Sequence, residues 1–547
     1  MDRFFLLRGI VLLLLVAGVT GCTDAPGQDS GGELLPEQAA YDVMHYDLAV
    51  TVQPDRQRIE GRLTVHAVVE EPLEVLVLNL DRRLSVRRIW EDGRRSRTRS
   101  FDRRADGNQL WIALGERHTV DDTLRVTVSY GGPPRVAPRP PWDGGFTWER
   151  TPGGAPWIAT SGQTEGADLW WPVKDHPSDE PDSMDLAFTV PDTLVAASNG
   201  VLRAVERASD STQTYRWHVS IPINTYNVTF NAAPYVHVDT SYASTGGADV
   251  PVSAYVLPSD SGRAAEALPG FLNQVRFLET TLGPYPARAD KYGIAQTPFL
   301  GMEHQSLIAY GHDFSPGGLG YDAPFDALHY HELAHEWYGN LVTAADWKDF
   351  WLHEGPATYL EALYAEHLEG DSAYHALTDY FRTRVGGGTP IARSSPTTAE
   401  QIYHQDVYFR GALTLHTLRH VVGEDTLRAI LRRFVTPDSA EGTPAFRSVT
   451  TRDFQRVAES VSGRSLEAFF DVYLYRGDLP RLQTNRSDGV LRLRWTNTGG
   501  AAFSVPVPVR VDGETHRVSM DGGAGTVSVP DGGDVQIDPK GWVLRER

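Results

Sequence analysis

The stretch YHELAHEWYGN, residues 330–340, holds two histidines four positions apart, with a glutamate directly after the first. On a helix, positions i and i+4 lie on the same face, so His331 and His335 would project side by side. Two neighbouring imidazoles in an H-E-x-x-H pattern are typical of a zinc site. The same letters also fit a helix with two solvated surface histidines. The pattern therefore needs a third ligand from elsewhere in the chain.

A candidate third ligand follows in the sequence WLHEGPATYLE, where 18 residues separate Glu354 from His335. Proline is tolerated only near a helix start, so Pro356 predicts that this second helix begins between residues 352 and 355. A helix hairpin of this length brings Glu354 back against the two histidines. Two His and one carboxylate leave the fourth zinc position open for water, which is the catalytic rather than the structural arrangement.

Length and composition limit the class of protein. A chain of 547 residues is too long for one core and predicts several domains. Its 41% hydrophobic and 10% aromatic content is ample for packed domains. The formal net charge is −20, from 71 acidic and 51 basic residues, and such a surface repels nucleic acid and anionic lipid headgroups. We therefore expect no nucleic-acid partner, and a monomer is our default expectation.

The N-terminus has the features of an export signal. Two arginines precede a short apolar run at residues 9–19, which is too short to span a bilayer. The following Val-Thr-Gly-Cys resembles the lipobox of bacterial lipoproteins, in which the cysteine is lipidated. We predict a signal peptide over residues 1–21, lipidation of Cys22 and a flexible tether over residues 22–38. The protein would then be an exported lipoprotein of a bacterial cell envelope, on the periplasmic side or in the outer membrane, that touches the membrane only through this anchor.

The hydrophobic periodicity changes twice along the chain. Apolar–polar alternation broken by Gly, Asp and Pro predicts an antiparallel β domain over residues 39–247. Helical periodicity dominates residues 248–478, where the helix that carries HELAH is expected to extend over residues 327–342 with Asp322 as its cap. Alternation returns over residues 479–547 and predicts a small β-sandwich-like domain. The predicted fold class is multidomain α+β.

These motifs together resemble the gluzincin aminopeptidases of the aminopeptidase N family. HELAHEWYGN followed by WLHEGPATYLE matches their H-E-x-x-H-x18-E signature, FLGMEHQS resembles G-A-M-E-N, and DVYFRGALTL resembles Y-x-K-G. The stretch TSGQTEGADLWWPVKDHPSDEPD resembles the N-terminal segment that supplies a Gln-x-Glu to the substrate pocket. The resemblance implies an N-terminal β saddle domain, a thermolysin-like catalytic domain and one catalytic zinc ion. The long C-terminal helical domain of larger members should be absent.

The resemblance also implies roles for individual residues. His331, His335 and Glu354 would bind the zinc ion, and Glu332 would act as the general base. Tyr408 would donate a hydrogen bond to the oxyanion. Substrate-binding residues would be Glu303, which pairs with a free α-ammonium group, Glu165 and Gln163 as further contacts, and the backbone of Gly301 and Met302, which could pair with an extended peptide. The expected partners are peptides with a free N-terminus.

The chain departs from the family pattern at several positions, and other functions are open. Leu300 and His304 replace the outer residues of G-A-M-E-N, and His353, Pro356 and Arg410 replace the family's Asn, Phe and Lys. None of these changes removes an ionisable group that the chemistry needs. One alternative function is epoxide hydrolysis on the same fold, and another is a zinc-free binding protein that has lost catalysis.

Overall fold

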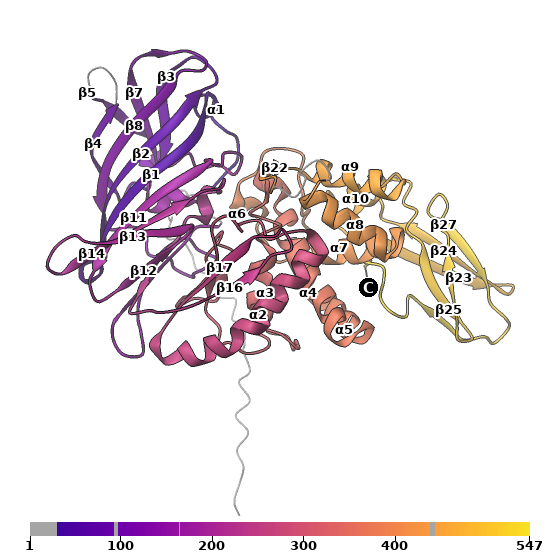
Figure 1. Ribbon diagram of the computed structural model, residues 1–547. Coiled ribbons are helices and arrows are strands. Elements are labelled where there is room, and N and C mark those ends of the chain that lie inside the picture. The colour runs from indigo at the N-terminus through magenta and orange to yellow at the C-terminus, as the bar shows by residue number, and fades with distance from the viewer. Residues whose placement is uncertain (1–29, 92–96, 164, 438–443, 547) are drawn as a thin grey trace, which may run out of the picture.

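The structure of the chain is a computed structural model. It describes residues 30–91, 97–163, 165–437 and 444–546. Figure 1 shows β-sheets at the N-terminal end, helices in the middle and small β-sheets at the C-terminal end. The predicted multidomain α+β architecture is therefore confirmed. The signal peptide and Cys22 lie outside the described residues.

The N-terminal part is built from β-sheets with mostly antiparallel strands. The largest sheet has the order β13-β14-β11-β1-β2-β8-β4-β5, and smaller sheets have the orders β12-β15-β10-β9 and β3-β7-β6. Strand β1 runs parallel to β11, in contrast to the purely antiparallel sheet that alternation predicts, because alternation reports a buried face and not a strand direction. The strand bounds are Tyr41–Gln53 (β1), Arg58–Val69 (β2), Leu73–Asn79 (β3), Ser85–Glu91 (β4), Arg97–Thr98 (β5), Phe101–Arg104 (β6), Gln109–His118 (β7), Thr123–Gly132 (β8), Gly145–Arg150 (β9), Pro156–Ser161 (β10), Ser183–Pro191 (β11), Val195–Ser198 (β12), Val201–Arg207 (β13), Thr212–Val219 (β14) and Phe230–Ala233 (β15).

The middle part combines a sheet of order β16-β17-β18-β20-β19 with the helices that follow it. The domain boundary predicted after residue 247 falls in the turn between β16 and β17. Strand β16 pairs with β17, and β17 pairs in parallel with β18, so the predicted boundary divides this sheet. The bounds are Val236–Ala243 (β16), Asp249–Val256 (β17), Tyr292–Gln296 (β18), Gly301–Met302 (β19), Ile308–Tyr310 (β20), Val342–Ala344 (β21), Arg447–Val449 (β22), Ser261–Leu282 (α2), Ala327–Ala334 (α3), Trp351–Glu369 (α4), Asp371–Arg384 (α5), Ala399–Ile402 (α6), Asp406–Val422 (α7), Glu424–Val435 (α8), Thr451–Ser462 (α9) and Glu467–Tyr473 (α10).

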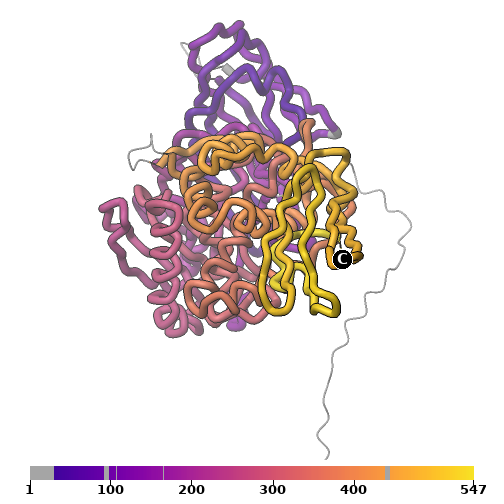
Figure 2. Tube along the Cα trace, turned by 90° about the vertical axis from the view of Figure 1, so that its right-hand side faces the viewer, coloured from indigo at the N-terminus to yellow at the C-terminus, as the bar shows by residue number. Residues whose placement is uncertain are grey.

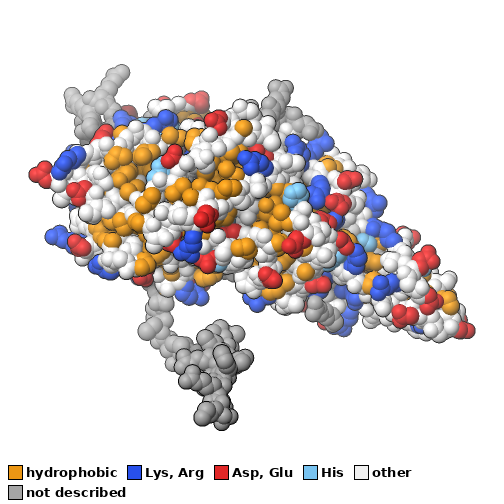
Figure 3. Space-filling model, turned by 60° about the horizontal axis from the view of Figure 1, so that its bottom comes forward, with side chains coloured by type: hydrophobic (Ala, Val, Ile, Leu, Met, Phe, Trp, Pro, Cys, Tyr) orange, Lys and Arg blue, Asp and Glu red, His pale blue; other side chains and the backbone are white. Residues whose placement is uncertain are grey.

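The C-terminal part consists of small sheets with the orders β23-β24-β27 and β26-β25-β28. Figure 2 shows these strands standing in front of the helical part. Their bounds are Arg481–Ser487 (β23), Val490–Thr496 (β24), Val507–Val511 (β25), Glu514–Val518 (β26), Ala524–Ser528 (β27) and Val535–Ile537 (β28). Buried hydrophobic side chains form a continuous core through all three parts. On the face shown in Figure 3, hydrophobic side chains gather over the broad end, and charged side chains of both signs crowd the narrow end.

From residue 30 the described chain is packed against the body, so this part of the flexible tether predicted over residues 22–38 is ordered. Ser30 is buried, its carbonyl oxygen accepts a hydrogen bond from Ala399, and its hydroxyl accepts one from the indole of Trp347. Helix α1 (Pro36–Ala39) then leads directly into β1. The composition of this stretch is typical of a linker, but these long-range contacts fix it. None of the helices in the described residues has the length and hydrophobicity to span a bilayer.

Candidate active site

Helix α3 is shorter than its sequence predicts. It begins at Ala327, where the side chain of Asp326 accepts a 2.9 Å hydrogen bond from the backbone N–H of His329. The prediction that Asp322 caps this helix is therefore wrong. Asp326, four residues later, is the cap, because its side chain accepts the hydrogen bond from the N–H of His329. The helix ends at Ala334, and His335 is its C-terminal cap instead of a residue in its interior. The two histidines still lie on the same side of the chain.

The predicted metal ligands come together. Nε2 of His331 and Nε2 of His335 each lie 3.3 Å from Oε2 of Glu354, and the two Nε2 atoms are 3.1 Å apart. All three side chains are buried. Glu354 lies in the first turn of helix α4. This helix begins at Trp351, one residue before the predicted start at residues 352–355, and Pro356 is its sixth residue. Among the described residues this is the group of His, Cys, Asp and Glu side chains arranged to hold a metal ion.

The environment of these atoms fits zinc. Nδ1 of His331 lies 2.7 Å from Oε1 of Glu361, and Nδ1 of His335 lies 2.9 Å from the carbonyl oxygen of Tyr338. Both Nδ1 atoms therefore donate, which leaves the two Nε2 atoms to face each other and Oε2 of Glu354. With both Nε2 atoms deprotonated, three electron-pair donors would converge on one point, where a metal cation could bind. A tetrahedral zinc ion with bonds of about 2.0–2.1 Å holds its ligand atoms about 3.3 Å apart, which matches their spacing.

The carboxylate of Glu354 is held in its ionised form. Burial opposes ionisation, but positive charge on His335 and hydrogen bonds from His331 and His335 outweigh it and keep the pKa of Glu354 well below its usual range. A metal ion held between the three side chains would supply positive charge at the same place. Its Oε1 atom accepts a 2.9 Å hydrogen bond from the side-chain amide of Gln163, which leaves Oε2 for the metal. One oxygen is thus positioned by the N-terminal part of the chain and the other by the histidines.

Glu332 lies beside the ligands and is buried. Its carboxylate approaches the backbone of Gly301 so closely that a Cβ atom added there would lie 2.5 Å from Oε1 of Glu332. A glycine at position 301 is therefore needed to leave room for this carboxylate. Burial, and then the charge of Glu303, raise the pKa of Glu332 to about 8. A carboxylate with a raised pKa is suited to accept and return a proton.

Glu303 lies in the same cavity, directly after the edge strand β19. It is buried, and its Oε1 atom accepts hydrogen bonds from Gln163 at 2.6 Å and from the hydroxyl of Tyr226 at 3.2 Å. Asn340 donates to its backbone oxygen at 3.1 Å, which fixes the turn that carries it. Burial raises the pKa of Glu303, and the charge of Glu354 adds to this effect. A cationic group beside Glu303 would offset both the cost of burying its charge and the repulsion from Glu354.

The structure does not bring Glu165 into the cavity. Its Oε1 atom pairs with Arg135 at 2.5 Å, and its Oε2 atom accepts a hydrogen bond from the backbone N–H of Gly144 at 2.5 Å. Both partners belong to the segment between β8 and β9, which carries Trp142 to the cavity wall. Glu165 therefore holds this segment in place. Gln163, by contrast, lies where the sequence predicts a substrate contact.

Tyr408 reaches the site from helix α7. Its ring lies 6.0 Å from that of His331, and its hydroxyl lies 2.7 Å from the hydroxyl of Tyr403. Burial raises the pKa of Tyr408 well above its ordinary value, so the phenol stays protonated and can donate. Helices α4 and α7 approach so closely that a Cβ atom at Gly355 would lie 2.9 Å from Cα of Gly411. This contact sets the distance between Tyr408 and the metal ligands.

Two of the residues that depart from the family pattern, His353 and Arg410, have polar partners, whereas the two ring nitrogens of the buried His304 have no hydrogen-bond partner among the described residues. His353 accepts a 2.8 Å hydrogen bond from the backbone N–H of Ala344, and burial lowers its pKa to about 3, so it is neutral. Burial likewise lowers the pKa of His304 to about 3. Arg410 points away from the cavity and donates to the backbone oxygens of Tyr473, Arg476, Gly477 and Thr389. The guanidinium fork suits this set of carbonyls better than the single ammonium of lysine.

A cavity of about 570 Å³ joins these groups. Its walls include both backbone candidates, Gly301 and Met302, which form the free edge of the middle sheet. Sequence reasoning missed two of the polar contacts. Glu361 follows Glu354 by seven positions, which is two helical turns on the same face, so helical spacing could have found it. Tyr226 is far from the motifs in sequence and gave no signal.

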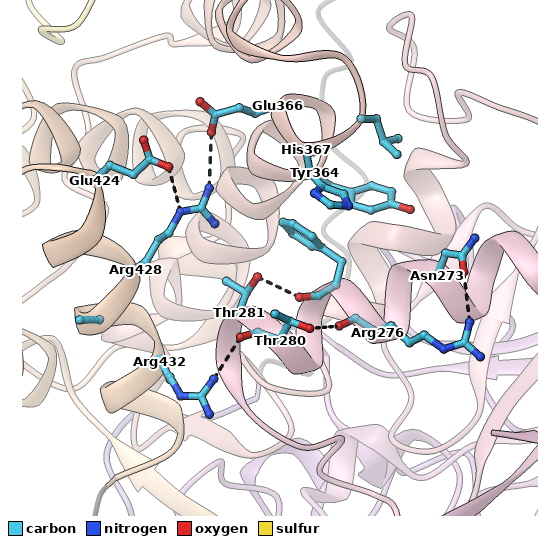
Figure 4. A pocket seen from close by; sticks show the side chains of 13 residues that line it. Asn273, Arg276, Thr280, Thr281, Tyr364, Glu366, His367, Glu424, Arg428 and Arg432 are labelled. Atoms are coloured by element: carbon cyan, nitrogen blue, oxygen red, sulfur yellow. Dashed lines mark hydrogen bonds and ion pairs between the residues drawn. The ribbon is translucent and has the colours of Figure 1, made fainter. Parts of the chain in front are cut away.

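A second hollow, of about 960 Å³, lies between α2, α4 and α8 and is drawn in Figure 4. Its charged groups satisfy one another. Arg428 pairs with Glu424 at 3.0 Å and with Glu366 at 3.6 Å, and Arg432 donates to the backbone oxygen of Thr280. The hollow has none of the metal ligands or the groups near them, so the smaller cavity is the candidate active site.

Comparison with known proteins agrees with this geometry. Residues 43–227 match the Peptidase M1 N-terminal domain and residues 288–473 match the Peptidase family M1 domain, which together span more than half of the chain. The structure is similar to that of a variant M1 zinc metallopeptidase from Deinococcus radiodurans bound to a Tyr-Ser-Ala substrate, with a TM-score of 0.66 and 26% identity. That match covers 81% of this chain and 96% of the other.

Curated relatives are more distant and longer. The chain is 24% identical to Endoplasmic reticulum aminopeptidase 1 of Mus musculus over 307 residues, which is 52% of this chain and 32% of that protein. It is 23% identical to Glutamyl aminopeptidase of Rattus norvegicus over 361 residues, 62% of this chain and 36% of that protein. The chain thus spans about a third of the length of these relatives.

Proposed function

The chain belongs to peptidase family M1, and from that premise we propose that it is a zinc-dependent aminopeptidase. It hydrolyses the first peptide bond of peptides with a free N-terminus and uses one zinc ion per chain. The observation that carries the proposal is the convergence of three metal-ligand atoms, 3.1–3.3 Å apart, in the cavity that also contains Glu332 and Glu303. The Tyr-Ser-Ala substrate of the Deinococcus radiodurans protein supports peptides as the substrate class.

His331, His335 and Glu354 would hold the zinc ion, which when bound lowers the pKa of a water molecule and polarises a carbonyl group. Glu332 accepts a proton from the attacking water and later delivers it to the leaving amine. Tyr408 donates its phenol proton in a hydrogen bond to the substrate carbonyl oxygen as negative charge develops there. Each of these side chains lines the cavity.

Glu303 accounts for cleavage at the chain end. Its buried carboxylate, with Gln163 bonded to the same oxygen, forms an acidic part of the cavity wall. A free α-ammonium group would pair with it, whereas a continuing peptide chain would bury an unpaired carboxylate. The free edge of β19 can pair with the backbone of the bound peptide.

The experiment assays a panel of aminoacyl-anilides and one epoxide with the purified chain, before and after chelation and after zinc is restored. The proposal predicts hydrolysis that chelation abolishes and zinc restores. Hydrolysis of an epoxide but of no anilide would favour the epoxide hydrolase. Zinc binding without turnover of any substrate would favour the binding protein.

We also infer that the protein is an exported lipoprotein of a bacterial cell envelope, anchored through Cys22. The arginines, the short apolar run and the Val-Thr-Gly-Cys sequence support this inference. Metabolic labelling with a palmitate analogue tests it. Labelling that Cys22→Ala abolishes is expected, and equal labelling of both chains would contradict it.

A further inference from the structure

The charges that line the active-site cavity are distributed unevenly. Among the described residues that line it, the carboxylates are Glu303, Glu332, Glu354 and Glu361, whereas Arg384 is the one lysine or arginine. A peptide with both termini free is a dipole, positive at its first residue and negative at its last. The cavity therefore has an acidic end for the α-ammonium group and a single basic group that could receive a carboxylate.

Arg384 is the last residue of helix α5 and is exposed. Its guanidinium carbon lies 6.0 Å from the ring of Tyr380 and 5.9 Å from the ring of Phe409. Its backbone oxygen accepts a 2.7 Å hydrogen bond from Gln405, which fixes the end of the helix. The structure gives the guanidinium no ion pair with a described carboxylate. Held against aromatic rings, it keeps its hydrogen-bond donors available.

A series of ring contacts links the metal ligands to Arg384 and limits the distance between them. The ring of Tyr408 lies 6.0 Å from that of His331, and the ring of Phe409 lies 6.4 Å from that of Tyr408. The guanidinium carbon of Arg384 in turn lies 5.9 Å from the ring of Phe409. An extended peptide advances about 3.5 Å per residue, so a carboxylate within about five residues of the scissile bond comes into range. Glu303, the metal ligands, Tyr408 and Arg384 all line this one cavity.

We propose that Arg384 is a specificity-determining residue that binds a carboxylate of the substrate downstream of the scissile bond. This inference rests on the proposed aminopeptidase function and names its substrate class: short peptides, of about two to five residues, that end in a free carboxylate. A planar guanidinium binds a carboxylate through two parallel hydrogen bonds, which a carboxamide cannot reproduce. An aspartate side chain in a downstream position offers the same chemistry.

The test compares Leu-Ala-Ala as the free acid, Leu-Ala-Ala-amide and Leu-Asp-Ala-amide with the zinc-loaded full chain. We expect kcat/KM to be about three- to tenfold higher for the free acid than for the amide, because exposed ion pairs are modest in strength. High salt should reduce this ratio, since Arg384 is exposed. If only the C-terminal carboxylate is recognised, Leu-Asp-Ala-amide will behave like the plain amide; if a side-chain carboxylate also serves, it will behave like the acid.

Variants test whether Arg384 causes the difference in kcat/KM between the free acid and the amide. Arg384→Ala should bring the ratio of acid to amide close to one, and Arg384→Lys should retain part of it. The matched control is Arg203→Ala, which removes an exposed arginine on β13 and should keep the wild-type ratio. Equal rates on acid and amide in the wild type, or an unchanged ratio in Arg384→Ala, would overturn the inference. No hydrolysis of any of the peptides would instead overturn the proposed function.

Discussion

The side-chain amide of Gln163 donates a 2.6 Å hydrogen bond to Oε1 of Glu303, across 140 positions of sequence. The same amide lies 2.9 Å from Oε1 of Glu354, so it bridges the acid that would bind the α-ammonium group and the acid that would bind zinc. Gln163 comes from the N-terminal β-rich part, and both carboxylates come from the middle part. The active site is therefore completed only when the two parts pack together.

The first prediction follows from this bridge. Gln163→Ala should lower kcat/KM for a free-N-terminal peptide by roughly 10- to 100-fold, because hydrogen bonds to charged groups contribute about 1.5–3 kcal/mol. Steady-state kinetics on Leu-Ala-Ala measure the effect. Gln483→Ala, at an exposed position on β23, is the matched control and should retain wild-type rates. Kinetics of Gln163→Ala equal to those of the control would contradict the bridging role.

Glu332→Gln tests the general base. The variant keeps the shape of the side chain but cannot accept a proton, so kcat should fall by roughly 10²–10⁴-fold. Zinc content, measured on the same sample, should be unchanged because Glu332 is not a ligand. A kcat within twofold of the wild type, at full zinc occupancy, would remove Glu332 from the mechanism.

Glu361→Gln tests the partner that orients His331. The 2.7 Å contact between Oε1 of Glu361 and Nδ1 of His331 fixes the tautomer that leaves Nε2 for the metal. Loss of the charge should weaken zinc binding about 10- to 100-fold. Competition with a chelator measures this affinity. Glu369→Gln, at the exposed end of the same helix, should bind zinc like the wild type, and equal affinities for all three proteins would refute the role.

The ligand set could be predicted from the sequence because its signals are local. His331 and His335 share a helical turn, and Pro356 places the start of the next helix to within one residue of its position. The alternating strands and the order of the three parts follow from periodicity in the same way. The fold class and the metal centre were therefore within reach of sequence reasoning.

The remaining features depend on pairings between distant segments. Glu165 was predicted as a substrate contact, but Arg135 competes for its carboxylate, and no local pattern reveals that pair. Ser30 lies in a sequence typical of a linker, yet contacts with Trp347 and Ala399 order it. Helix α3 ends at Ala334, and Gly339, with φ 136°, has a conformation that a helix does not adopt, so the helix cannot extend to residue 342.

Lys291 provides a test of the packing between the N-terminal and middle parts. Its ammonium group is buried and donates to the backbone oxygens of Ser198, at 2.9 Å, and Gly200. Burial lowers the pKa of Lys291 from 10.5 to about 7. Between these two values the unfolded chain holds a proton here that the folded chain lacks. The free energy of unfolding should therefore rise with pH over this window, by up to ~1.4 kcal/mol per pH unit.

Lys291→Met removes this contribution. Urea midpoints at pH 7, 8 and 9 should show the wild type gaining stability relative to Lys291→Met as the pH rises. Lys540→Met, which removes an exposed lysine paired with Asp371, should follow the wild type. A difference between wild type and Lys291→Met that stays constant with pH would show that Lys291 is charged in the folded chain throughout.

The central claim is that a zinc site beside a buried ammonium-binding carboxylate removes one residue at a time from a free N-terminus. Mass spectrometry of the products from Leu-Ala-Ala-Ala and its N-acetylated form, with zinc-loaded and chelated protein, tests it most directly. We predict that zinc-loaded protein releases leucine first from the free peptide, and that the acetylated peptide and the chelated protein give no product. Cleavage of the acetylated peptide at a comparable rate, or a first cut at an internal bond, would contradict the account.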